Sequence, residues 1–426
     1  MIVMGGIIGA GIFTNPAVVA KLVHTPSLIL GAWAAGGLIA LAGAFIYAEL
    51  SSQVTSSGGQ YVYLRMAMHP LVAFVYGWSL LFVIQTGGMA AVALIFANHA
   101  LELFGFAANE FRSAVIGSVA LAILTLINCI GVRAGSATQN VFMILKLLAI
   151  AALVVIGLTM TGSPSSAAPA SAGSLTTWQT LVAFGAALIP AQFAYGGWQT
   201  ACFVAGEVRE PRRNLPRGLL LGVLGVIVVY LSVNYVCVHA LGASGLAETK
   251  TPASAVMRLA LGERGARFIA AGIAISTIGF LSQSMLTAPR VYFAMADDGL
   301  FFKQLAWLNR ARVPAVAIAL QGGLAIVIAL IASKFEQILN YVVSVDVIFF
   351  ALSAVCVFVF RKHRAPDADV FRVPGHPWTT LFFIAACGVI TFSLIYKFPL
   401  NSAISFSIML LGVPAYFIWA KQRPNR

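Results

Sequence analysis

Long apolar stretches follow one another along almost the whole chain, and they restrict its fold more than any other feature of the sequence. Hydrocarbon offers backbone groups no hydrogen-bond partner, so a segment that crosses a membrane must be a helix or part of a closed barrel. The stretches reach the roughly 20 residues that a spanning helix needs, and they lack the alternation of apolar and polar residues that is typical of barrel strands. The sequence therefore predicts an all-α, polytopic membrane protein.

Twelve membrane spans are predicted, with boundaries good to about 4 residues. They cover residues 2–22, 27–50, 70–98, 113–131, 139–160, 178–205, 217–241, 265–289, 314–333, 338–360, 376–395 and 401–420. The connections between the spans are short, so we expect no separate soluble domain. With 60% hydrophobic and only 9% charged residues, the chain has the composition of a protein that lives in the lipid bilayer.

The basic residues indicate how the chain is oriented. With the N-terminus in the cytoplasm, 17 of the 26 lysines and arginines fall in inside loops or the C-terminal tail, 8 fall outside, and Lys146 alone falls within a span. Because cytoplasmic loops of membrane proteins carry an excess of Lys and Arg, we expect a multi-pass protein of the cell (inner) membrane with both termini cytoplasmic. The same distribution accounts for the net charge of +13 without a nucleic-acid partner.

Several other chemistries have no support in the sequence. The five cysteines all lie in apolar stretches, where they read as small buried hydrophobes, so no disulfide-linked subunit is expected. The six histidines form no metal-binding pattern. We expect no metal, no cofactor and no enzymatic activity, and neither a polar-lined pore nor a filter motif indicates a channel.

Two glycine clusters interrupt spans at corresponding places. Span one carries "GGIIGAGIF" (5–13), and span six carries "FAYGGW" (193–198) just after Pro190. Unwinding a helix frees backbone groups that can line a binding site, and the half-helix N-terminus after a break favours an anionic group such as a carboxylate. Paired interruptions of this kind point to the substrate site of a secondary transporter. The alternative is close helix packing, because Gly5 and Gly9 also form a GxxxG pair.

Four motifs together resemble the amino acid–polyamine–organocation superfamily, and within it the L-type amino acid transporters and their bacterial relatives. The two glycine clusters are accompanied by "YAELSSQVTSSGGQYVYL" (47–64) and "EVREPRRNLPRG" (207–218). The resemblance implies a five-plus-five inverted-repeat (LeuT-like) fold in which helices 1 and 6 are broken. Residues 1–160 would form the first repeat, 161–177 an extracellular-side loop, 178–360 the second repeat, and 361–426 a cytoplasmic loop with helices 11 and 12 and the tail. Only about five residues precede the first break, so its first half-helix is expected to be short.

The resemblance also implies an amino-acid site at the two breaks. The substrate carboxylate would bind the backbone amides around Gly9, Ala10 and Gly11. The ammonium would face carbonyls near Ile7 and near Phe193, Ala194 and Gly196, and the Phe193 ring would cap the site. Ala10 stands where the family commonly has a serine, so one hydroxyl contact is lost while the backbone amide remains.

Ionisable residues within spans are costly, about 2.5–3.5 kcal/mol on insertion scales, and are candidates for function. Lys146 either snorkels to the interface or, as the resemblance implies, replaces sodium and contacts the first break together with Ser276 and Thr277. Asp346 is a candidate for structural hydrogen bonding or for coupling and gating. Glu207 lies in an arginine-rich inside loop and is a candidate gate residue, and Glu49 is expected to contact inner loops.

These features together predict a secondary active transporter that works by alternating access. Small residues in the pocket motif, with no acidic or basic partner for a side chain, favour neutral L-amino acids as substrates. Replacement of sodium by Lys146 implies sodium-independent transport, and exchange is the leading expectation. The alternative is proton-coupled symport.

Overall fold

The computed structural model describes residues 2–131, 136–160, 176–331, 335–363 and 369–421, apart from the side chains of 136–140 and 421. Within these residues the chain is helical and contains no strand. The first part of the chain forms the helices α1 (Ile2–Ile7), α2 (Gly11–Val23), α3 (Pro26–Gln53), α4 (Gln60–Ala67), α5 (Pro70–Ser79), α6 (Gln85–Leu103), α7 (Glu110–Ile130) and α8 (Ser136–Thr159). A π-helical turn, Leu80–Ile84, joins α5 to α6.

The second part of the chain is also helical. It forms α9 (Thr177–Tyr195), α10 (Thr200–Phe203), α11 (Pro211–Glu248), α12 (Pro252–Thr287), α13 (Pro289–Asp297), α14 (Ala315–Ile331), α15 (Phe335–His363), α16 (Trp378–Lys397) and α17 (Pro399–Lys421). Short 3₁₀ turns cover Ala205–Glu207 and Lys303–Ala306. Each of the twelve predicted spans coincides with a helix or a broken helix of this series.

The described chain contains nine segments that are long and apolar enough to cross a membrane. Two further apolar helices, Gly11–Val23 and Ala315–Ile331, are shorter. Large apolar side chains lie exposed on outer faces, as on α7, where Phe111, Leu126 and Ile130 are 78%, 64% and 71% exposed. An aqueous surface would not tolerate such a face, whereas lipid requires it. The chain is therefore a multi-pass membrane protein, and the count of twelve spans stays a prediction.

Two helices differ from the predicted ranges for a local reason. The span predicted at 265–289 begins earlier, at Pro252, because α12 continues through a kink at Gly262, where φ is +66°. The span predicted to end at residue 241 continues to Glu248 through a similar kink at Gly242, where φ is +67°. Glycine reaches this left-handed region without the steric cost that a side chain would bring, so each helix turns sharply and starts again.

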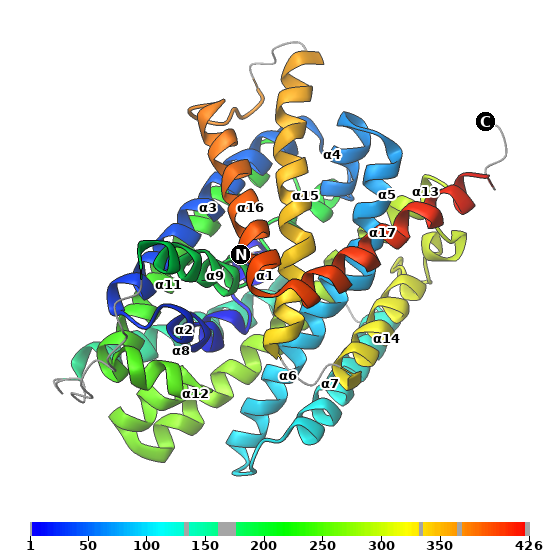
Figure 1. Ribbon diagram of the computed structural model, residues 1–426. Helices are drawn as coiled ribbons and strands as arrows, with labels where there is room; N and C mark the ends of the chain where they lie inside the picture. Colours follow the sequence, from blue (N-terminus) through cyan, green and yellow to red (C-terminus); the bar gives the residue numbers. More distant parts are fainter. Residues whose placement is uncertain (1, 132–135, 161–175, 332–334, 364–368, 422–426) are drawn as a thin grey trace.

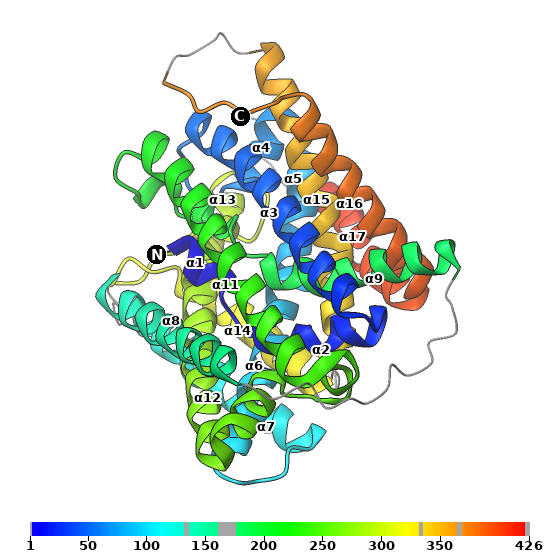
Figure 2. The ribbon, with the colours of Figure 1, turned by 90° about the vertical axis from the view of Figure 1, so that its left-hand side faces the viewer.

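Both predicted interruptions are present. The first broken helix consists of α1 and α2, separated by residues 8–10, and the second consists of α9 and α10, separated by residues 196–199. Both α1 and α2 contact α11, beside which they are seen in Figure 2, and α2 also packs on α9. Around them, α3 lies along α11, α12 contacts α6 and α8, and α14 lies beside α7 (Figure 1). The two breaks are thus held at the centre of the bundle.

Candidate functional site

The two interruptions pack directly against each other. A Cβ atom added at Gly6 would lie 2.8 Å from the carbonyl oxygen of Gly197, and one added at Gly11 would lie 2.8 Å from the Cα of Ala194. Gly197 itself has a φ of +107°, which disfavours any residue with a side chain. Glycine at these positions therefore allows both the unwinding and the close approach of the two backbones.

Close helix packing, the alternative role considered for the GxxxG pair Gly5 and Gly9, is present in the structure. Gly5 faces the side chain of Gln283, and a Cβ at Gly9 would lie 3.0 Å from the ring of Phe280. Both neighbours belong to α12, so the pair lets α1 and the first break approach that helix. Gly9 also lines the central pocket, which means that one glycine serves packing and the pocket together.

Two buried side chains bind carbonyls that the first break frees. The Nζ of Lys146, on α8, donates to the oxygen of Ile8 at 2.8 Å, and the lysine is only 2% exposed. The hydroxyl of Tyr230, on α11, lies 3.0 Å from the oxygen of Ile7 and 3.2 Å from that of Ala194. Tyr230 thereby joins the first break to the second, a role that the sequence did not reveal because a tyrosine in an apolar stretch carries no sign of its partner.

Other backbone groups at the breaks keep free hydrogen-bonding capacity. The amide of Gly9 donates to the oxygen of Ile7 at 2.8 Å, but the amides of Ala10 and Gly11 have no acceptor in the described part of the chain. At the second break, the oxygens of Phe193 and Gly196 likewise have no donor among the described residues. The arrangement offers donors on one side and acceptors on the other, which suits a carboxylate and an ammonium group.

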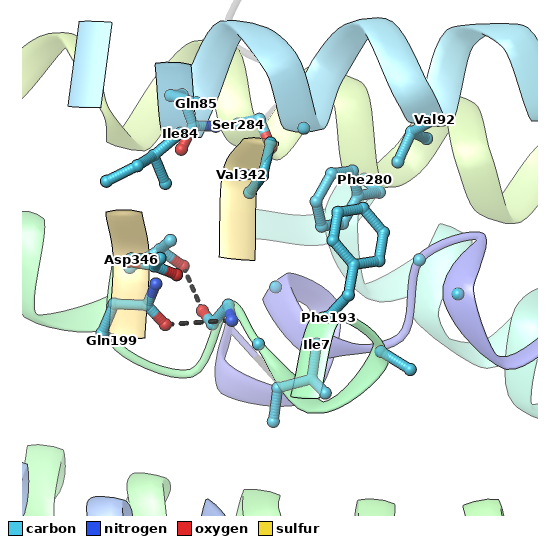
Figure 3. Close-up of a pocket in the computed structure, with 18 of the residues that line it drawn as sticks. Ile7, Ile84, Gln85, Val92, Phe193, Gln199, Phe280, Ser284, Val342 and Asp346 are labelled. Atoms are coloured by element: carbon cyan, nitrogen blue, oxygen red, sulfur yellow. Dashed lines mark hydrogen bonds between the residues drawn. The ribbon is translucent and has the colours of Figure 1, made fainter. Parts of the chain in front are cut away.

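A pocket opens between the breaks. It contains all seven residues that the sequence analysis assigned to substrate binding, which are Ile7, Gly9, Ala10, Gly11, Phe193, Ala194 and Gly196. Helices α6, α12 and α15 complete its wall, with Gln85, Ser284 and Asp346 among the polar residues that they contribute (Figure 3). A hydrogen bond within the second break stabilises its conformation, because Gln199 Oε1 accepts from the amide of Gly197 at 2.9 Å.

The acceptors predicted for Lys146 on α12 are not in contact with it through hydrogen bonds. The hydroxyl of Thr277 donates within its own helix, to the oxygens of Ile273 and Ala274 at 3.0 and 2.8 Å. The buried hydroxyl of Ser276 has no hydrogen-bond partner among the described residues. The lysine thus reaches the first break as expected, whereas the expected hydrogen bonds to Ser276 and Thr277 are wrong for this conformation. The Thr277 hydroxyl turns to its own helix backbone, as threonine hydroxyls readily do, and the Ser276 hydroxyl stays unpaired among the described residues.

Polar and aromatic contacts lie on both sides of the pocket. On one side, Phe193 packs edge-on against Phe335 with ring centroids 5.7 Å apart, and Lys21 pairs with the adjacent Glu336 at 3.1 Å. On the other side, beyond α10, Glu207 pairs with Arg290 of α13 at 3.0 Å. Both ion pairs join one broken helix, or the turn that follows it, to a neighbouring helix.

Comparison with known proteins agrees with this architecture. A model of the amino acid permease family matches residues 1–419. The serine/threonine exchanger SteT of Bacillus subtilis (strain 168) is 31% identical over 432 residues, which covers 100% of this chain and 96% of the relative. The human large neutral amino acids transporter small subunit 2 is 29% identical over 421 residues, covering 98% and 78%. The human b(0,+)-type amino acid transporter 1 is 28% identical over 388 residues, covering 88% and 77%.

The match extends over both interruptions, the pocket between them and nearly all the surrounding helices. The chain therefore belongs to the amino acid permease family of membrane transporters.

Proposed function

We propose that this protein exchanges neutral L-amino acids across the cell membrane by alternating access and without sodium. The observation that carries the proposal is the pairing of free backbone groups at the pocket. The amides of Ala10 and Gly11 can bind a carboxylate, and the oxygens of Phe193 and Gly196 can bind an ammonium group. A pocket that recognises both groups of the amino-acid backbone, while holding few side-chain charges, fits a neutral zwitterion.

Lys146 supports sodium independence. Its ammonium group lies 2.8 Å from a carbonyl oxygen that the first break exposes, and it is buried in the bundle. A fixed positive charge on this oxygen does what a bound cation would do, so transport needs no ion from solution. The serine/threonine exchanger among the relatives supports exchange as the transport mode.

Alternating access requires that the pocket opens in turn to the two sides of the membrane, commonly by rocking of one bundle against the rest. The contacts of Phe193 with Phe335 and of Glu207 with Arg290 are placed to break and re-form during such a motion. We place both termini in the cytoplasm, as the distribution of basic residues favours, and residues 1–160 and 178–360 in the two inverted repeats.

Transport into proteoliposomes tests this function. Labelled serine, alanine or leucine should enter vesicles preloaded with unlabelled amino acid, and replacement of sodium by choline should leave the rate unchanged. Uptake only into empty vesicles that carry an inward proton gradient would contradict exchange. It would favour the second candidate, proton symport, for which the Asp346 carboxyl at the pocket is the supporting observation.

A pocket-filling variant checks that transport passes through this site. Gly88 lines the pocket on α6, and a Cβ there would meet no atom within 4 Å, so Gly88→Leu should fill the pocket without local strain. We expect exchange to fall about 10-fold or more, since the leucine takes the space of the substrate and overpacking of the occupied site costs roughly 1–3 kcal/mol. Gly388→Leu is the matched control, because Gly388 is exposed on α16 and equally free of neighbours. Equal exchange by both variants would exclude this pocket as the transport site.

A further inference from the structure

Two polar side chains on the wall of the pocket form no hydrogen bond within the part of the chain that the structure describes. Gln85 of α6 is 8% exposed and Asp346 of α15 is partly buried, and both line the pocket together with Ser284 of α12. Among the residues that the structure describes, none makes a hydrogen bond with the side chain of Gln85 or Asp346. A desolvated amide or carboxyl group without a partner is costly, so these groups call for a ligand in the pocket.

The positions of the two groups indicate which part of a ligand they meet. In Figure 3, Gln85, Ser284 and Val342 project from helices that face the two breaks. Asp346 lies beside the segment that carries Gln199. If the backbone of an amino acid binds at the breaks, its side chain extends toward this wall. Gly88 follows Gln85 by three residues, on the same face of α6, and leaves room there for substrate atoms.

We propose that Asp346, assisted by Gln85, selects amino acids whose short side chain carries a hydrogen-bond donor. An ionised carboxylate only accepts hydrogen bonds, so it binds a hydroxyl or ammonium group and repels an acidic side chain. Opposite a methyl group the carboxylate itself is left without a partner. The apolar residues Phe193, Phe280 and Val342 bound the rest of the pocket, which favours short side chains such as those of serine and threonine. This inference rests on the proposed function. It narrows the neutral substrates to those with a short hydroxylated side chain and adds short amino acids whose side chain carries an ammonium group.

Competition between isosteric amino acids tests the inference. Serine is compared with 2-aminobutyrate, and threonine with valine, as inhibitors of labelled alanine exchange in proteoliposomes. Because a hydrogen bond to a charged group is strong, the parent protein should prefer each hydroxylated member about 10-fold or more. Asp346→Leu should bring both ratios close to 1, measured on whatever alanine exchange the variant retains.

A conservative variant distinguishes hydroxyl from ammonium donors on the substrate. It also keeps the inference testable if Asp346→Leu fails to fold. Asp346→Asn keeps a carbonyl acceptor, so it should still prefer serine over 2-aminobutyrate but lose the binding of 2,4-diaminobutyrate, whose ammonium group needs the charge. Glu110→Gln, at the exposed start of α7, removes an acidic charge far from the pocket and should behave as the parent.

The outcomes distinguish the inference from the proposed function. Alanine exchange with equal competition by serine and 2-aminobutyrate in the parent would overturn the inference alone. Retention of the serine preference by Asp346→Leu would also overturn it. A parent protein that exchanges no amino acid at all would overturn the proposed function, and the inference with it.

Discussion

The hydroxyl of Tyr230 is a single group on which both interrupted helices depend. It contacts the oxygens of Ile7 and Ala194, and its ring packs between Trp33 and Tyr195, with centroid distances of 5.7 and 5.0 Å. Tyr230→Phe keeps these ring contacts and removes only the hydroxyl. Since the two carbonyls then lose their buried donor, we expect stability to fall by about 1–3 kcal/mol and exchange to fall with it, measured by thermal unfolding in detergent and by proteoliposome exchange.

Tyr292 provides the matched control for this change. It is also fully buried, but its hydroxyl has no hydrogen-bond partner in the described part of the chain. Tyr292→Phe should therefore leave both stability and exchange at the level of the parent, or raise stability slightly. An equal loss in the two variants would show that the Tyr230 hydroxyl has no special role at the breaks.

The sequence could predict the breaks and Lys146, but not which residues far apart in the chain form hydrogen bonds with each other. The breaks were predictable because glycine clusters in an apolar stretch are a local signal, and Lys146 was predictable because a charge within a span is costly. The link from Tyr230 to Ile7 joins residues 223 positions apart, and no local pattern encodes it. Hydrogen bonds of Lys146 to Ser276 and Thr277 were wrongly expected because the sequence does not say which way a hydroxyl turns.

The positions of the helices were predictable because each depends on a local feature of the sequence, the apolar stretch itself. The length of an apolar stretch predicts where a span lies. The largest shifts of the observed ends occur at the glycine kinks of Gly242 and Gly262, since a kinked helix stays helical on both sides. How the helices are joined at their ends depends instead on long-range pairs. The inverted repeat is a relation between whole blocks of helices and stays a prediction.

The carboxylate of Glu49 ties the end of α3 to Arg361 at the end of α15 and to the segment that follows that helix. The carboxylate accepts from Arg361 Nε at 2.8 Å, from Arg361 Nη2 at 2.6 Å and from the amide of Val373 at 2.7 Å, and Glu49 is 1% exposed. Replacing the carboxylate leaves the guanidinium of Arg361, which is 28% exposed, and the amide of Val373 without their charged acceptor, which costs about 1–3 kcal/mol. Glu49→Gln should therefore lower the unfolding temperature markedly.

The pair between Lys21 and Glu336 is the natural comparison, because it too joins two helices. Its side chains are 46% and 54% exposed, and exposed pairs contribute only about 0–1 kcal/mol. Glu336→Gln should thus change the unfolding temperature little. If the two variants lose the same stability, burial does not determine the strength of these connections.

For the molecule as a whole, transport demands that the contacts at the two sides of the pocket are not permanent. Lys21 belongs to α2 of the first broken helix and Glu336 to α15, so a cross-link between positions 21 and 336 would fix one side of the pocket. In the double variant Lys21→Cys, Glu336→Cys, a short bifunctional methanethiosulfonate should abolish exchange, and dithiothreitol should restore it. Each single variant and the parent, whose five cysteines are free, receive the same treatment as controls. Exchange at the parent's rate by fully cross-linked protein would mean that α2 and α15 move as one body, and that the pocket opens on that side by another route.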